Sequence, residues 1–464
     1  MEINKASGFT ETEKNLSEIC EKTFLNIWSY ANPFNEQGKE FCDVIALFEN
    51  HMFIFFDRNK KLDFVSDDDF HIKWNRWTKN VIDAQINTCY GAERYIKNGR
   101  KLYLDSKMTM EFPLRFDVEN LIIHKIIVAH GAKEACLKFS GENINGSIGM
   151  HYGIFSENAK LPFYISLPKE NPVHVFDSHN LEIILGELDT FYDFTNYIMA
   201  KENAIKENIF ISYCGEEDLL AYYFMNFDQD KKKHYIGQKD CMGFVLDQGI
   251  WNEFIKSPAY LVRKQEDKIS YFWDELIKEI GKNALKGKLQ GNGNVFLGNS
   301  GIYEMAKEPR FMRRMLSQNM IEAIKNFPKI DSPIGRFIRV MTSYYKDVNY
   351  VFLQYKFDIA GKDVNDEDIK KMRQYFLEVA CASTKIISFP DSKKIIGIGM
   401  APLKYYPRTN KDILLMDFAT WNDEMEKYYL EENKLELNRF HLTGKEQYKE
   451  FHAKEFPESK LKNE

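Results

Sequence analysis

Hydrophobic and polar residues alternate along the chain with periods that change several times. Helical spacing predicts helices over Thr12–Trp28 and Trp74–Ile96. Between them, the apolar runs Phe41–Phe48 and Met52–Phe56 are separated by a short polar break, which predicts a hairpin. The β-branched run Leu121–Ala129 predicts a buried strand. Residues 1–140 therefore have the pattern of an α/β domain.

The rest of the chain predicts two further domains. Residues 150–287 form a mostly helical middle domain with a few strands, and residues 301–464 form a small C-terminal α/β domain. Polar, glycine-containing breaks at Ser140–Gly149 and Gly287–Gly301 separate the three parts. The expected strands are Phe163–Leu167, Val173–Phe176, Tyr350–Phe357, Ile395–Gly399 and Ile413–Met416, and the expected helices cover Leu181–Ile205, Glu216–Phe227, Ile269–Ile280, a stretch after Pro309, and Asp366–Ile387.

Composition narrows the class of protein. The chain has 464 residues, of which 44% are hydrophobic and 28% charged, so it is neither disordered nor of low complexity. A net charge of −6 excludes a wholly basic nucleic-acid coat. The seven cysteines are widely spread without a C-x-x-C pair, as in a reduced cytoplasmic protein. Apolar runs are too short for a membrane helix, so no membrane partner is expected.

One histidine-rich stretch allows two interpretations. His174, Asp177 and His179 offer two imidazoles and a carboxylate, which are ligands for a transition metal. Their spacing fits neither one face of a helix nor a known fixed loop. Asp177 also directly precedes a predicted helix, where an aspartate serves as an N-cap. The N-cap role explains the aspartate at position 177 without assuming a bound metal.

The N-terminal hairpin carries the strongest candidate site. Asp43 lies near the start of one predicted strand and Asp57 at the end of the next, with Glu13 on the preceding helix and Gln85 on the following one. Carboxylates that converge at strand ends hold Mg²⁺ or Mn²⁺, and the metal activates water for phosphodiester hydrolysis. We therefore expect Asp43 and Asp57 to bind metal, with Glu13 and Gln85 assisting.

This order of elements resembles the PD-(D/E)xK core of restriction-endonuclease-like nucleases over about the first 130 residues. The resemblance implies a restriction-endonuclease-like N-terminal domain. A larger part of the chain resembles an uncharacterised bacterial protein family of similar length, through the stretches TETEKNLSEIC, FLNIWSYANPFNEQGKEFCDVIALFENHMFIFFDR, YGAERYI, VAHGA, VHVFDSHNLEIILGELDTFYDF, GEEDLLAYYF and YVFLQY.

The chain departs from the nuclease pattern at the position of its basic residue. If Arg58 takes the place of the lysine, Phe56 occupies the acid position. Arginine keeps the charge but does not readily lose a proton, and Lys60 is an alternative from the loop. A two-residue hairpin turn would place Asp57 on the opposite face from Asp43, whereas a three-residue turn or a bulge would let them share a metal. The sequence leaves the register open.

Structural explanations exist for several of these residues. Thr10 and Glu13 have the spacing of a capping box, and Asp57 and Arg58 can form an ion pair at a strand end. Away from the hairpin, Arg310, Arg313 and Arg314 are expected to share one helix face. That face is either a solvated surface or a phosphate-binding, nucleic-acid-binding surface.

The leading hypothesis is a Mg²⁺-dependent endonuclease acting on DNA or RNA, as an effector of a bacterial anti-phage defence system. In it Asp43 and Asp57 bind metal, and Arg58 or Lys60 orients water. The alternative is a binding or scaffold protein that keeps the nuclease fold without the chemistry and recognises a partner protein or nucleic acid. The Arg58 replacement and the acidic N-terminal segment favour this alternative.

Overall fold

A computed structural model describes residues 3, 5–63, 67–140, 145–153, 161–237, 241–286, 293–329, 331–357, 366–406, 411–437, 440–444, 447 and 453–457. The predicted breaks at Ser140–Gly149 and Gly287–Gly301 lie partly outside these residues. The chain divides into two compact units. Residues 3–261 form the first unit, and residues 262–464 belong to the second. The mixed α/β class predicted from the sequence is confirmed.

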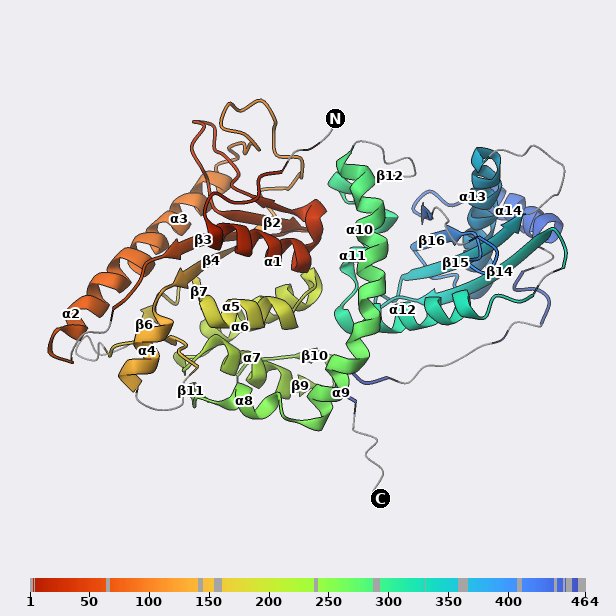
Figure 1. The fold of residues 1–464 in the computed structure, drawn as a ribbon. Coiled ribbons are helices and arrows are strands. Elements are labelled where there is room, and N and C mark those ends of the chain that lie inside the picture. Colours follow the sequence, from red (N-terminus) through yellow and green to blue (C-terminus); the bar gives the residue numbers. More distant parts are fainter. Residues whose placement is uncertain are drawn as a thin grey trace, which may run out of the picture. The chain divides into compact units, whose positions relative to one another are not determined.

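A five-stranded sheet forms the centre of the first unit (Figure 1). Its order is β1 (Ser29–Ala31), β2 (Val44–Phe48), β3 (His51–Asn59), β4 (Ile122–His130) and β7 (His174–Asp177). The first three strands are antiparallel, whereas β3, β4 and β7 are parallel. The carboxyl ends of these three parallel strands therefore meet at one edge of the sheet, where ligands commonly bind in α/β folds.

Helices cover both faces of this sheet because its strands carry apolar residues on both sides. On one face, Phe24 of α1 (Glu11–Trp28) packs against Phe53 of β3, with ring centroids 5.5 Å apart. The helices α5 (Ser178–Glu187) and α6 (Phe191–Glu207) continue this layer (Figure 1). Helix α3 (Ala84–Lys97) covers the other face, where Lys125 of β4 pairs with Glu93 at 3.1 Å.

A second sheet completes the first unit. Its strand order is β11 (Gly243–Leu246), β8 (Phe210–Tyr213), β5 (Gly149–Gly153) and β6 (Tyr164–Leu167). The remaining elements up to the end of this unit are α2 (Asp67–Thr78), the π-turn η1 (Lys79–Asp83), α4 (Lys133–Ser140), α7 (Glu216–Met225), β9 (Phe227–Asp228), β10 (Lys233–His234), α8 (Ile250–Phe254) and α9 (Pro258–Asp267), which crosses into the second unit.

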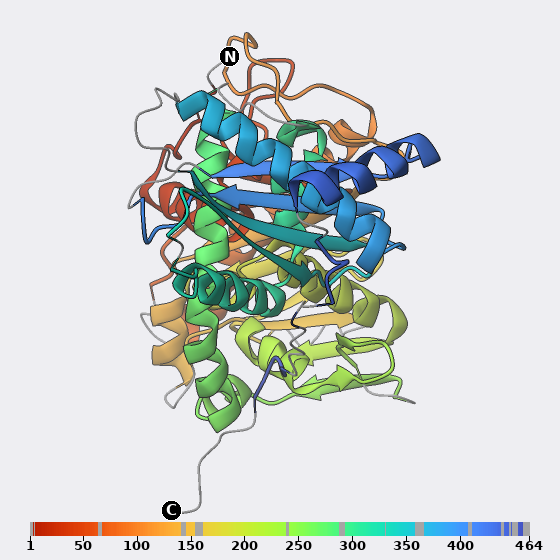
Figure 2. The same cartoon turned by 90° about the vertical axis from the view of Figure 1, so that its right-hand side faces the viewer.

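The second unit is built on a four-stranded sheet in the order β14 (Ile334–Thr342), β15 (Val348–Phe357), β16 (Lys394–Met400) and β17 (Asp412–Asp417). Figure 2 looks onto this unit, whose strands run from teal to blue. One face packs against α13 (Asp366–Ser383), which lies close because Gly397 has no side chain to meet Leu377. The other elements are η2 (Lys268–Ser270), α10 (Tyr271–Leu285), β12 (Gly293–Asn294), η3 (Val295–Leu297), β13 (Asn299–Ser300), α11 (Gly301–Lys307), α12 (Arg310–Lys325), η4 (Thr384–Ser388) and α14 (Asp423–Glu436).

Two features of the organisation differ from the sequence predictions. The boundary between domains 1–140 and 150–287 does not separate compact units, because β7 pairs with β4 inside the N-terminal sheet. The single helix expected over Leu181–Ile205 is two helices, because Thr190 caps α6 through a 3.1 Å bond from the Asp193 amide. Within the described ranges, no helix is both long and apolar enough to cross a membrane.

Candidate active site

The hairpin that carries Asp43 has a two-residue turn and a bulge. Phe48 pairs with His51 across the turn, and Val44 pairs with Phe55 at the far end. The amide of Asp43 also donates to the Phe55 carbonyl, at 3.0 Å, so Asp43 and Val44 both oppose one residue. Such a bulge changes the direction of a side chain at a strand end. The sequence left the register of the hairpin open between a two-residue turn, a three-residue turn and a bulge. The structure has a two-residue turn together with a bulge at Asp43.

The bulge brings Asp43 to two other carboxylates, and we name Glu13, Glu40 and Asp43 the acidic cluster. Each offers one oxygen, and these oxygens all lie within 4.8 Å of one another. Glu13 comes from the first turn of α1, Glu40 from the loop before the hairpin, and Asp43 from the position directly before β2. Asp43 is buried and Glu40 is exposed, so the cluster reaches from the sheet edge to solvent.

Asn32 connects two members of the acidic cluster. Its side-chain Nδ2 donates to Glu13 Oε2 at 3.2 Å and to Glu40. Its backbone lies in the left-handed region with φ 46°, which asparagine tolerates better than most residues. The side chain is fully buried, and Asn32 Oδ1 has no hydrogen-bond partner among the described residues. Asn32 therefore holds Glu13 and Glu40 close to each other from a buried position.

The arrangement of the acidic cluster disfavours the ionised form of Asp43, as the pKa of this residue shows. The pKa of Asp43 is raised to about 7, mainly by burial and in addition by the negative charges of Glu40 and Glu13. Two contacts oppose this rise: the Asp57 amide donates to Asp43 Oδ2 at 2.7 Å, and Arg58 Nη1 lies 3.4 Å from the same oxygen. A bound cation would offset the charge of the three carboxylates, so the donor set fits a divalent metal.

A hydrogen-bonded relay lies next to the acidic cluster, and we name Asp57, His130 and Ser178 the relay. His130 Nε2 donates to Asp57 Oδ1 at 2.6 Å, and its Nδ1 lies 2.8 Å from Ser178 Oγ. These residues come from the carboxyl ends of β3, β4 and β7, with Ser178 opening α5. If Asp57 accepts the Nε2 proton, the Nδ1 lone pair of His130 faces the hydroxyl. This is the geometry of an oriented general base.

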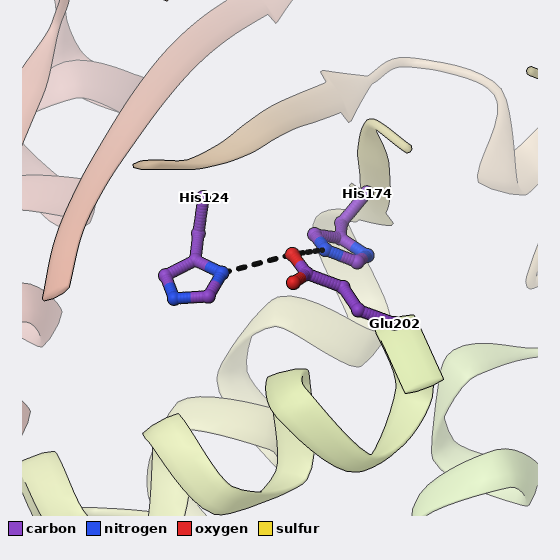
Figure 3. A group of neighbouring side chains, drawn as sticks. All are labelled: His124, His174 and Glu202. Atoms are coloured by element: carbon purple, nitrogen blue, oxygen red, sulfur yellow. Dashed lines mark hydrogen bonds and ion pairs between the residues drawn. The ribbon is translucent and has the colours of Figure 1, made fainter. Parts of the chain in front are cut away.

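A second, separate group of side chains that could hold a metal ion lies on the α6 side of the sheet, and we name His124, His174 and Glu202 the histidine–glutamate cluster (Figure 3). Glu202 Oε1 accepts from His124 Nδ1 at 2.8 Å and from His174 Nε2 at 3.0 Å. Both rings are fully buried, and burial lowers the pKa of His174 to about 4. His174 is thus a neutral imidazole near pH 7.

The stretch His174–His179 does not itself form a metal site. Asp177 is the N-cap of α5 and accepts from the His179 and Asn180 amides at 2.8 and 2.9 Å. The structural interpretation of this aspartate is therefore confirmed. His179 lies 3.4 Å from Lys133, whereas His174 belongs to the histidine–glutamate cluster.

The structure brings together some of the predicted site residues and separates others. Asp43, Glu13 and Arg58 are neighbours, but Asp57 directs its carboxylate to His130 and Thr12 instead of joining the acidic cluster. Lys60 is exposed beyond the end of β3. Gln85 is buried on α3 and is not a member of the acidic cluster.

The prediction that three arginines of α12 form an exposed surface is wrong. Arg310, Arg313 and Arg314 are buried, with 1–3% of each residue exposed. Arg310 and Arg313 both bind the Asp274 carboxylate at 2.7 Å, and Arg314 lies 3.2 Å from Asp267. The helical spacing correctly grouped the three residues. It could not show that acidic residues of α9 and α10 cover that face.

Sequence reasoning missed Glu40, Asn32, His130 and Ser178. His130 lies in the quoted stretch VAHGA and Ser178 in VHVFDSHN, at the ends of two predicted strands. Polar residues directly after buried parallel strands were the available signal. Glu40 lies in a loop without a pattern, so no comparable signal existed for it.

Comparisons with known proteins assign no relatives. No protein-family model matches the chain, and no curated protein or solved structure is significantly similar to it.

Proposed function

We propose that the first unit is a metal-dependent nuclease that hydrolyses phosphodiester bonds in DNA or RNA. The observation that carries the proposal is the acidic cluster, in which three carboxylate oxygens from separate elements lie within 4.8 Å of one another. The order of α1, an antiparallel hairpin, α3 and a parallel strand also agrees with the nuclease-core resemblance. Both features support hydrolysis at the edge where β3 and β4 end.

Glu13, Glu40 and Asp43 would hold Mg²⁺ or Mn²⁺, because carboxylate oxygens are the preferred ligands of these ions. When bound, the metal supplies charge stabilisation and a more acidic water. Asn32 positions Glu13 and Glu40 through its two hydrogen bonds. The Asp57 amide fixes Asp43 from the other side.

Arg58 is the residue of this site best suited to bind the phosphate. Its side chain is 39% exposed, so the guanidinium can reach a substrate while Nη1 stays near Asp43. A planar guanidinium binds phosphate oxygens in pairs and keeps its charge. His130, oriented by Asp57, can accept a proton at Nδ1 from Ser178 or from a water that takes the place of this hydroxyl. These roles do not require Arg58 to act as a base.

A specific observation favours the second candidate, a binding or scaffold protein with the nuclease fold. Phe56 is fully buried in the sheet, at the position where the nuclease pattern has an acid. Arg58 stands where that pattern has lysine. If the protein is such a binding or scaffold protein, the acidic cluster contributes only to the fold or to partner binding.

A cleavage assay separates the two candidates. Purified protein with Mg²⁺ or Mn²⁺ should cut at least one of plasmid DNA, single-stranded DNA and RNA. Asp43→Asn should lower the rate by ~10²-fold or more, because metal charge stabilisation is worth several kcal/mol. Asp117→Asn, which makes the same change at an exposed aspartate, is the matched control and should cut normally. Metal-dependent cutting by a folded Asp43→Asn protein at the normal rate would contradict the nuclease site, and no cutting by the unmodified protein would favour the scaffold.

A further inference from the structure

We propose that the histidine–glutamate cluster is a binding site for a transition-metal ion of the Zn²⁺ class. Two imidazole nitrogens and one carboxylate oxygen, from His124, His174 and Glu202, lie within 4.8 Å of one another. Neutral imidazole together with one carboxylate is a donor set for Zn²⁺ and similar ions, whereas Mg²⁺ prefers oxygen ligands alone. The site is therefore chemically distinct from the acidic cluster.

The three ligands come from three rigid elements. His124 lies within β4, His174 begins β7, and Glu202 lies in the middle of α6. Both rings point toward the same carboxylate oxygen from opposite sides, as Figure 3 shows. A small shift of the Glu202 carboxylate would let an ion bind His124 Nδ1 and His174 Nε2, with the proton of each ring carried by its other nitrogen.

A fourth residue supports the site from outside. His51 Nδ1 lies 2.9 Å from His124 Nε2, the ring nitrogen that does not face Glu202. Metal-ligating histidines usually make such a second hydrogen bond, which fixes the ring orientation and the tautomer. Phe53 stacks on the His124 ring with centroids 4.7 Å apart, which further restricts its rotation.

Burial and access also suit a metal site. Both histidines are fully buried, and His174 Nδ1 has no hydrogen-bond partner among the described residues. This nitrogen is not the one that contacts Glu202, so it can carry the ring proton while Nε2 binds the ion. The Glu202 side chain is 20% exposed, so an ion can reach the cluster from solvent. Three protein ligands leave a coordination position open, as in catalytic zinc sites.

Titration of the chelator-treated full chain with Co²⁺ tests this proposal, because Co²⁺ replaces Zn²⁺ and absorbs visible light. Excess Mg²⁺ is present throughout to fill the acidic cluster. We expect one Co²⁺ per chain with an imidazole-ligated spectrum, displaced by Zn²⁺. Glu202→Gln should weaken binding by roughly 100-fold or more, since loss of a supporting residue alone costs 10–100-fold. His179→Asn is the matched control and should bind normally.

Two results would overturn the proposal. One is the absence of an imidazole-ligated Co²⁺ spectrum for the unmodified protein. The other is unchanged Co²⁺ affinity in folded Glu202→Gln protein. If the Glu202→Gln protein does not fold, His51→Asn replaces it. Because His51 touches only the outer nitrogen of His124, this change should weaken Co²⁺ binding by about 10-fold. Unchanged affinity in folded His51→Asn protein would equally contradict the site, and failure of the nuclease proposal would leave all these results unaffected.

Discussion

Asp57 connects the acidic cluster and the relay of the first unit through its backbone and its side chain. Its amide donates to Asp43 Oδ2 at 2.7 Å, while its carboxylate accepts from His130 Nε2 at 2.6 Å. The first bond fixes a carboxylate of the acidic cluster, and the second orients the imidazole of the relay. Asp57 therefore connects the acidic cluster with the relay and is not itself a member of the acidic cluster, where the sequence predicted a metal ligand.

The acidic cluster should lower the stability of the metal-free protein. Because the folded-state pKa of Asp43 is raised to about 7, Asp43 contributes most to stability below its unfolded pKa of 3.8. This contribution is lost as the pH rises toward 7. In EDTA, Asp43→Asn should match the unmodified protein near pH 4 and become more stable by on the order of 1–3 kcal/mol at pH 8. Urea unfolding at both pH values measures this difference. A variant that is less stable at pH 8 would show that Asp43 is mainly structural.

Substitutions at different residues of the relay should have different effects on the cleavage rate. Asp57→Asn should slow cleavage, because an amide cannot hold the His130 imidazole in the same tautomer as a carboxylate does. If His130 activates water, Ser178→Ala should keep most of the activity. If Ser178 is itself the nucleophile, the same change should abolish it. Steady-state rates of the two variants, and mass spectrometry for a covalent adduct on Ser178, distinguish these cases.

The arginines of α12 should affect stability. Arg313 donates to Asp274 Oδ1 at 2.7 Å and to the Ala306 and Glu308 carbonyl oxygens. Arg313→Ala leaves these buried acceptors without their donor and should destabilise the protein by about 3–5 kcal/mol. Chemical denaturation measures this loss, and the exposed Arg76 gives the matched control Arg76→Ala. A stable Arg313→Ala protein with weakened nucleic-acid binding would instead restore the phosphate-binding interpretation.

Glu308 predicts a pH dependence in the second unit. The residue is fully buried, and burial raises its pKa to about 7, against hydrogen bonds from Ser343, Tyr344 and Tyr350. Because the folded-state pKa is higher than the unfolded value of 4.5, the stability from this group is complete below pH 4.5 and is lost as the pH rises through 7. Glu308→Gln should flatten the fall in unfolding free energy between pH 5 and 7, although it loses an acceptor for the Tyr344 amide. If the unfolding free energy of the Glu308→Gln protein falls between pH 5 and 7 as steeply as that of the unmodified protein, the raised pKa of Glu308 is contradicted.

Local pattern was enough to predict most elements of the sheet. The runs around Phe53 and Ile126 have strand character in isolation, and β3 and β4 form there. Long-range pairing was not visible, so β7 was assigned to another domain although it pairs with β4. The burial of Arg313 was missed for the same reason, because Asp274 lies on a different helix. The bulge at Asp43 depends on backbone hydrogen bonds that no side-chain pattern encodes.

Calorimetric titration with Mg²⁺ at pH 8 tests the central claim most directly, because it needs neither substrate nor partner. The unmodified protein should bind Mg²⁺ at the acidic cluster, and Asp43→Asn should lose this binding. His174→Asn should retain it, because Mg²⁺ binds poorly to imidazole. Equal Mg²⁺ binding by the unmodified protein and a folded Asp43→Asn variant, or no binding by either at millimolar Mg²⁺, would contradict the proposed metal-dependent nuclease.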